Sequence, residues 1–148
     1  MLSVGNKAPA IVAHDQDGNT VSLSDFKGKK VVLFFYPRDN TPTCTEQACD
    51  LRDNIGAIRK AGYEILGVSV DDEKSHRKFI QKFGLPFPLL ADPDHKIVEA
   101  YGVWGEKTLF GKKYMGTLRT TFIIDEKGTI TRIIDKVKAK EHTAQILG

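Results

Sequence analysis

Long hydrophobic runs and runs of like charge are both missing from this sequence of 148 residues. No apolar stretch approaches the ~20 residues that a membrane-spanning helix needs, which argues against a membrane role. The 22 lysine and arginine residues stand beside 19 acidic ones, and the net charge is only +3. A nucleic-acid-binding protein usually gathers its cations on a stripe or a tail. The two densest basic stretches, residues 111–113 and 136–140, fit a solvated surface better, so we expect no nucleic-acid partner.

A secretory signal is missing too, because residues 1–7 show no basic stretch, apolar segment or small-residue cleavage site. We therefore expect the protein in the cytoplasm, where thiols are kept reduced. Internal repeats, low-complexity tracts and linkers are also absent from the sequence. Residues 1–148 are accordingly expected to form a single domain.

Cysteine and histidine are scarce, with two and four residues respectively. A structural zinc site needs four ligands, and the four histidines are scattered without ligand spacing. We therefore expect no metal and no cofactor. In a cytoplasmic protein, two cysteines are more consistent with thiol chemistry than with a structural disulfide.

Hydrophobic patterning predicts an α/β fold. Residues 30–36, which read Lys-Val-Val-Leu-Phe-Phe-Tyr, are typical of a strand buried on both faces. We expect strands over residues 10–13, 20–23, 30–36, 63–70, 89–91, 120–125 and 129–134, and helices over residues 41–62, 71–84, 95–101 and 140–147. Residues 102–117 have no clean period and are expected to be a loop with possible short strands.

The order of these elements predicts one mixed central sheet with helices on both faces. A parallel βαβ half occupies the first two-thirds of the chain and joins an antiparallel hairpin near the C-terminus. The first two strands flank a turn-forming cluster at residues 15–19, so they predict an N-terminal β-hairpin extension.

Both cysteines lie in the segment that follows the strand at residues 30–36. Thr41 is a candidate N-cap and Pro42 suits the first helical position, which places Cys44 in the first helical turn. Unpaired backbone N–H groups and the positive end of the helix dipole favour an anion there, and thiolates form readily at such sites. Cys44 is therefore predicted to be a reactive nucleophile. Two alternatives remain, a buried thiol that acts only as a small apolar side chain and a Cys-His hydrolase.

Cys49 follows Cys44 by five residues. On an intact helix this spacing turns through about 500°, leaves the side chains roughly 140° apart and gives a rise of about 7.5 Å. A disulfide usually needs Cα atoms within about 7 Å and Cβ atoms that face each other. The two cysteines therefore cannot bond while the helix is intact, and pairing would require its first turn or two to unwind. The spacing also differs from the Cys-x-x-Cys motif of thioredoxin-like oxidoreductases.

The motif Pro37-x-x-x-Thr41-x-x-Cys44 resembles the active-site signature of the peroxiredoxins, which are thiol peroxidases on a thioredoxin-like fold. The position of Cys49 is similar to that in the branch called bacterioferritin comigratory protein or peroxiredoxin Q. The resemblance continues, in the right order, through residues 4–9, 35–37, 100–104 and 119–125.

The resemblance implies a role for five residues. Cys44 would be the peroxidatic cysteine, whose thiolate attacks the O–O bond and becomes a sulfenic acid, and Cys49 would be the resolving cysteine. Thr41 would hydrogen-bond the peroxide, and Pro37 would shield the site. Arg119 would hold the thiolate and the peroxide, although it lies far from Cys44 in the sequence.

The implied activity is thioredoxin-dependent reduction of hydrogen peroxide and organic hydroperoxides, with thioredoxin or a similar dithiol protein as reductant. An intrachain Cys44–Cys49 disulfide is expected, and a disulfide between two chains stays open. A monomer is expected, although the apolar side chains near Trp104 and Phe110 could support a weak dimer. The alternative function is a redox-sensing or chaperone-like interaction protein switched by the same cysteines. Arg38, nearer in sequence, competes with Arg119 as the cation beside Cys44.

Overall fold

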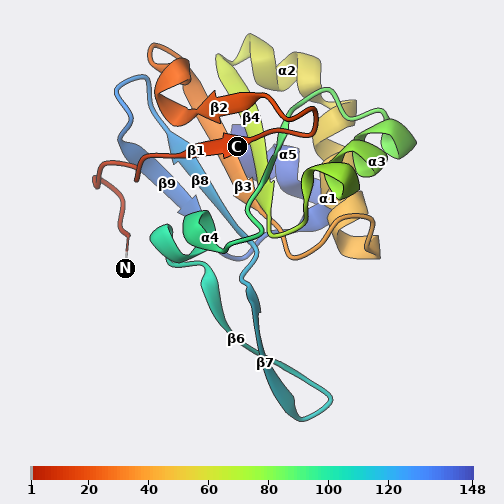
Figure 1. Cartoon of the computed structure of the whole chain (residues 1–148). Coiled ribbons are helices and arrows are strands. Elements are labelled where there is room, and N and C mark those ends of the chain that lie inside the picture. Colours follow the sequence, from red (N-terminus) through yellow and green to blue (C-terminus); the bar gives the residue numbers. More distant parts are fainter. Residues whose placement is uncertain (1) are drawn as a thin grey trace.

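The computed structural model describes residues 2–148 and is built around a mixed β-sheet (Figure 1). The strands are β1 (Val12–His14), β2 (Thr20–Ser22), β3 (Lys30–Phe35), β4 (Tyr63–Ser69), β5 (Leu89–Ala91), β6 (Trp104–Leu109), β7 (Lys112–Thr117), β8 (Thr120–Ile124) and β9 (Ile130–Ile134). The helices are α1 (Pro42–Asp53), α2 (Ile55–Lys60), α3 (Glu73–Phe83), α4 (Lys96–Ala100) and α5 (His142–Leu147), with short 3-10 turns at Leu23–Phe26 and Ala139–Glu141.

Seven strands form the main sheet, in the order β2-β1-β5-β4-β3-β8-β9. The central pairs β3–β4 and β4–β5 are parallel, whereas β8 and β9 add to the sheet as antiparallel strands. The chain's first two strands pair as an antiparallel hairpin at the opposite edge. The predicted mixed sheet and the N-terminal hairpin are thereby confirmed.

Strand β3 is buried on both faces, as its sequence predicts. Val31, Leu33 and Phe35 belong to one apolar cluster, which α4 and the N-terminal segment cover. The residues between them, Val32 and Phe34, belong to a second cluster with apolar side chains of α1, α2, α3 and α5. Helices therefore lie on both faces of the sheet, as expected.

The helix expected over residues 41–62 is interrupted at Asn54. α1 ends at Asp53 and α2 begins at Ile55, because Asn54 leaves the helical conformation with φ −115° and ψ 16°. Its side-chain Nδ2 donates to the carbonyl oxygen of Asp50 at 2.8 Å, and such bonds from Asn compete with the helical ladder. After the break, Gly62 adopts φ +93° and ends the segment.

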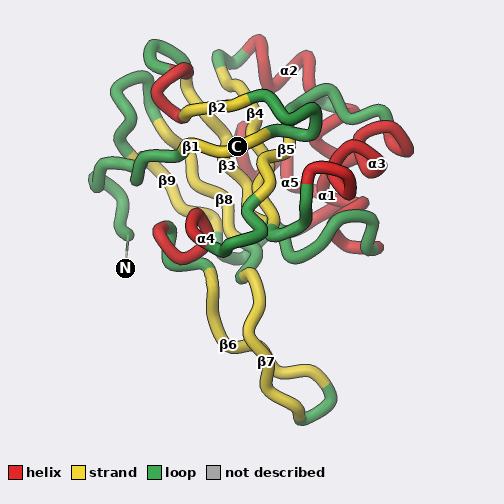
Figure 2. The backbone as a smooth tube through the Cα atoms, viewed as in Figure 1, coloured by secondary structure: helices red, strands yellow, loops and turns green. Residues whose placement is uncertain are grey.

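Residues 102–117, expected to be a loop with possible short strands, contain the two six-residue strands β6 and β7, which pair along their whole length. They form a separate two-stranded hairpin that projects from the body of the molecule (Figures 1 and 2). Its turn lies at Phe110 and Gly111, which both have positive φ, as a two-residue hairpin turn requires. Most of its side chains face solvent, so its sequence lacks the apolar alternation that marks a half-buried strand.

Helix α5 carries a buried histidine that connects it to the sheet. The His142 side chain is fully buried, with Nδ1 2.9 Å from Oε1 of Gln145 and Nε2 2.8 Å from Oγ1 of Thr121. An amide oxygen only accepts, so Nδ1 carries the proton and Nε2 accepts from the threonine hydroxyl. Burial lowers the pKa of His142, and this outweighs the hydrogen bond to Gln145, which raises the pKa.

Stability should therefore fall in mildly acidic solution. An unfolded histidine binds its proton near pH 6.5, whereas His142 in the folded protein binds it only at lower pH. Below about pH 6.5 the unfolded state therefore holds more protons than the folded state. Each pH unit between the two pKa values lowers the free energy of unfolding by about 1.4 kcal/mol. Urea unfolding at pH 7.5 and 5.5 should show this loss in the native protein and a smaller loss in His142→Gln. Equal losses in both proteins would contradict the assignment.

Within residues 2–148, no helix has the length and apolar character needed to cross a membrane.

Candidate functional site

Cys44 lies in the first turn of α1, beyond the carboxyl end of β3, and its side chain is buried. The guanidinium Nη2 of Arg119 donates to its Sγ at 3.2 Å. Arg119 immediately precedes β8, and the antiparallel register places Thr120 opposite Phe35 at the end of β3. Sheet pairing therefore brings the two side chains together across 75 positions of sequence.

Gln47 completes this contact and was missed by the sequence analysis. Its Oε1 accepts a hydrogen bond from Nη1 of Arg119 at 2.6 Å, so the guanidinium is held by Gln47 and Cys44 together. Gln47 follows Cys44 by three residues, the spacing that places two side chains on one helix face. That spacing was the signal in the sequence. Among residues 2–148, the buried Nε2 of Gln47 has no hydrogen-bond partner.

Thr41 takes the N-cap position that the sequence predicts, but its side chain does not cap the helix within the described chain. Its Oγ1 donates instead to the carbonyl oxygen of Arg38 at 2.9 Å, which closes a tight turn before α1. Pro37 opens the same loop and is half-buried. The Arg38 side chain is exposed, so of the two competing arginines it is Arg119 that contacts the sulfur.

Cys49 lies about 1.4 turns further along α1 and is half-buried. Both cysteines are free thiols on one continuous helix. The helical spacing analysed above therefore applies to the folded structure, and the two sulfurs face different directions.

Lys107 of the projecting hairpin is a second cation near the site. Its Nζ donates to the carbonyl oxygen of Thr117 at 3.1 Å. Burial, and then the charge of Arg119, lower the pKa of Lys107, while Cys44 acts in the opposite direction. Lys107 and Arg119 both line a cavity of about 750 Å³ whose other walls include Val103, Leu118 and Phe122. Lys107 was not among the residues predicted from the sequence, because its place beside the site depends on the β6–β7 hairpin.

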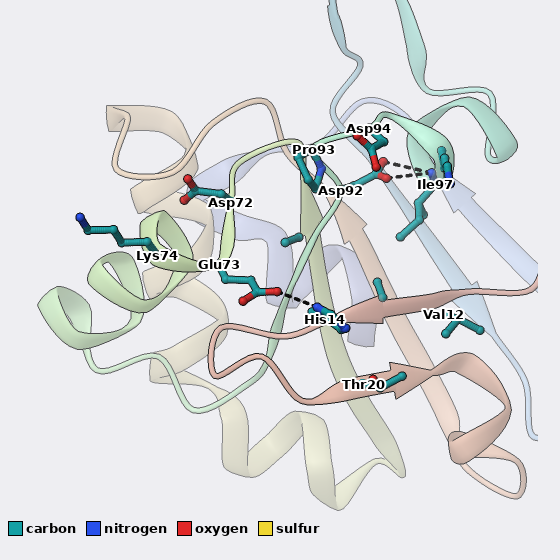
Figure 3. A pocket seen from close by; sticks show the side chains of 13 residues that line it. Val12, His14, Thr20, Asp72, Glu73, Lys74, Asp92, Pro93, Asp94 and Ile97 are labelled. Carbon is teal, nitrogen blue, oxygen red and sulfur yellow. Dashed lines mark hydrogen bonds and ion pairs between the residues drawn. The ribbon is translucent and has the colours of Figure 1, made fainter.

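A different cavity, of about 630 Å³, lies between the N-terminal hairpin, the start of α3 and the loop before α4 (Figure 3). Several of its charged side chains are engaged with neighbours: His14 pairs with Glu73 at 2.8 Å, and the Asp92 carboxylate accepts from the backbone N–H of Ile97. None of the five predicted site residues lines this cavity. The candidate chemistry therefore belongs to the edge of the sheet where Cys44 lies.

The chain is similar to known proteins over nearly its whole length. The model of the AhpC/TSA family matches residues 4–133. Peroxiredoxin Bcp of Bacillus subtilis is 47% identical over 146 residues, which cover 99% of this chain and 93% of the relative. A cysteine-to-serine mutant of PrxQ from Xylella fastidiosa has a TM-score of 0.93 at 29% identity, covering 99% of this chain and 94% of that one. The bacterioferritin comigratory protein of Xanthomonas campestris, studied for alkyl peroxide reduction, has a TM-score of 0.86 at 35% identity, covering 93% of this chain and 87% of that one.

Proposed function

The chain belongs to the AhpC/TSA family and is a thiol peroxidase of the Bcp, or peroxiredoxin Q, type, and on this premise we propose that Cys44 is its peroxidatic cysteine and Cys49 its resolving cysteine. The fold of the solved relatives also confirms the thioredoxin-like architecture that the resemblance implied. The observation that carries the proposal is the contact of Arg119 with Cys44 Sγ at 3.2 Å.

In the first step, the Cys44 thiolate attacks one oxygen of the peroxide. The S–O bond forms as the O–O bond breaks, and the leaving oxygen takes a proton and departs as water or an alcohol. The product is a sulfenic acid on Cys44. Arg119 and the backbone N–H groups at the start of α1 stabilise the thiolate, and fixed donors at this point stabilise the charge that develops on the leaving oxygen.

Thr41 and Pro37 would form the peroxide side of the site. The Thr41 hydroxyl proton is committed to the carbonyl oxygen of Arg38, so its oxygen lone pairs are available to accept from the O–H of a peroxide. Pro37 has no backbone N–H and presents an apolar ring beside the loop, which suits a shielding role. Hydrogen peroxide and organic hydroperoxides share the reacting O–OH group, and both are proposed substrates.

In the second step, the Cys49 thiolate attacks the sulfur of the Cys44 sulfenic acid. The S–S bond of an intrachain disulfide forms as the S–O bond breaks, and the leaving hydroxide takes a proton and departs as water. Because the cysteines lie five residues apart on α1, the start of this helix must unwind before the sulfurs can meet. The helix start lacks a side-chain cap in the described chain, and a cap typically contributes about 1 kcal/mol. This favours local unwinding from the N-terminal end.

Thioredoxin or a similar dithiol protein would then reduce the disulfide by thiol exchange. The resolution step needs no second subunit, so we propose that the protein acts as a monomer. The cytoplasm suits this cycle, because its reducing environment returns both cysteines to the thiol form.

Mapping the disulfide tests the proposed cycle. The protein should consume peroxide continuously with thioredoxin, thioredoxin reductase and NADPH. After one equivalent of peroxide without reductant, trypsin cleavage at Arg38 and Arg52 should release residues 39–52 with both cysteines and two hydrogens fewer. A covalent dimer on non-reducing electrophoresis would contradict the intrachain disulfide. Reversible oxidation without turnover would contradict the catalytic cycle.

A further inference from the structure

A buried network fixes the loop between β3 and α1 to neighbouring elements, and the mechanism above does not use it. The Asp39 carboxylate accepts from the Tyr36 hydroxyl at 2.6 Å and from Oγ of Ser75 at 2.8 Å. Its Oδ2 also lies 2.7 Å from Nδ1 of His76. The backbone N–H of Asp39 donates to Oδ2 of Asp71 at 2.8 Å. One loop residue is thus connected to the residue directly after β3, to α3 and to the segment after β4.

The positions of the hydrogens follow from the partners. Nε2 of His76 lies 3.0 Å from the carbonyl oxygen of Leu90, which only accepts, so Nε2 carries a proton. Nδ1 of the same ring faces the Asp39 carboxylate at 2.7 Å, so the His76 side chain connects Asp39 to the backbone of β5. Burial, and then the Asp39 carboxylate, raise the pKa of Tyr36 well above its ordinary value, which keeps its hydroxyl a donor.

This cluster also has the composition of a cation site, since ligand atoms of Asp39, Asp71 and His76 lie within 4.8 Å of one another. Each of those groups is already engaged: Asp71 accepts from Ser69 as well as from Asp39, and His76 contacts Asp39 through the nitrogen that a metal would take. The hydrogen bonds therefore account for the arrangement without an ion.

Asp39 occupies a critical point of the loop. It lies within the turn that the Thr41 hydroxyl closes on the carbonyl oxygen of Arg38. The next residue, Asn40, has φ +59°, in the left-handed region that Asn tolerates better than most residues. The orientation of the Thr41 hydroxyl therefore depends on this turn, and the buried side-chain contacts of Asp39 hold the turn in place.

We propose that Asp39 and His76 are positioning residues for the peroxidase reaction, which hold the loop of residues 37–41 in place while the start of α1 unwinds and refolds beside it. The inference rests on the proposed function of Cys44. The two ends of the site then differ in mobility. The loop that receives the peroxide stays fixed on α3 and on the segment after β4, and the helix that carries the sulfur moves.

Two rate constants can distinguish a positioning role from an effect on the thiolate: that of Cys44 alkylation and that of Cys44 oxidation. Both are measured in a Cys49→Ser background, where Cys44 is the single thiol. Alkylation of Cys44 by iodoacetamide needs the thiolate but not the peroxide-binding loop, whereas oxidation by hydrogen peroxide needs both. Asp39→Asn should slow oxidation roughly 10- to 100-fold, the range expected for a misplacement of about 1 Å, and leave alkylation unchanged. Tyr36→Phe, which removes one hydroxyl from the network, should slow oxidation less and in the same selective way.

The matched control is Asp15→Asn. Asp15 is also a buried carboxylate and accepts from the backbone N–H groups of Asp17 and Asn19, but it lies in the turn between β1 and β2. Both of its rates should equal those of the parent. If Asp39→Asn does not fold, the same two rate constants of Tyr36→Phe test the positioning role. Unchanged oxidation, or an equal fall of both rates, would overturn the positioning role, whereas a parent protein that does not react with peroxide would overturn the proposed function itself.

Discussion

Replacing Cys44 with serine should abolish peroxide turnover, with a loss of roughly 10⁴-fold or more, as expected when a catalytic nucleophile is removed. Serine is close in size to cysteine and fits the same buried position at the start of α1. Its hydroxyl does not ionise near neutral pH, so Arg119 would have no anion to stabilise and no group would attack the O–O bond. The measurement is peroxide consumption coupled to thioredoxin, thioredoxin reductase and NADPH.

Cys49→Ser is the matched variant for this experiment, because it removes the other thiol of the same helix. It should lose sustained turnover but still consume about one equivalent of peroxide, leaving Cys44 as a sulfenic acid that dimedone traps. Substantial turnover in Cys44→Ser would show that Cys49 is the attacking thiol and would reverse the two assignments.

Replacing Arg119 with methionine should lower the rate constant for Cys44 oxidation roughly 10²- to 10³-fold, the loss typical for one fixed donor to a developing negative charge. Methionine fills much of the same volume but donates no hydrogen bond. The substitution removes the 3.2 Å contact with Cys44 and leaves the buried Oε1 of Gln47 without its donor. Stopped-flow oxidation of the Cys49→Ser background gives the rate constant.

Arg38→Met is the control, since Arg38 is nearer to Cys44 in sequence but its side chain is exposed. Its oxidation rate should stay close to that of the parent. Alkylation by iodoacetamide should also slow in Arg119→Met, because this arginine stabilises the thiolate itself. Equal rates in the Arg119 and Arg38 variants would contradict the role of Arg119.

Local patterns were sufficient to predict the centre of the molecule. Residues 30–36 are apolar and β-branched without interruption, and Pro42 suits a first helical turn, so β3, α1 and the position of Cys44 followed from neighbouring residues alone. Arg119 came only from the family resemblance. Its place beside Cys44 depends on the antiparallel pairing of β8 with β3, and no short-range pattern encodes that pairing.

The secondary structure differs from the expectation at two places, each for its own physical reason. Apolar spacing suggested one helix over residues 41–62, but a single side-chain hydrogen bond from Asn54 to the backbone interrupts it. Apolar alternation was absent from residues 104–117 because β6 and β7 project away from the core. The network around Asp39 draws on the residue after β3, on α3 and on β5, so it requires the register of the parallel strands to be known first.

The break at Asn54 determines how far a conformational change in α1 can spread. Helix melting is cooperative along an unbroken ladder of hydrogen bonds, so a continuous helix over residues 41–62 would couple the cysteines to every turn behind them. Here the ladder stops at Asp53, and α2 keeps Ile58 packed in the core as a separate unit. Unfolding of the cysteine-bearing helix α1 can thus end at Asn54 without unfolding α2. Each catalytic cycle would therefore melt about three helical turns at most.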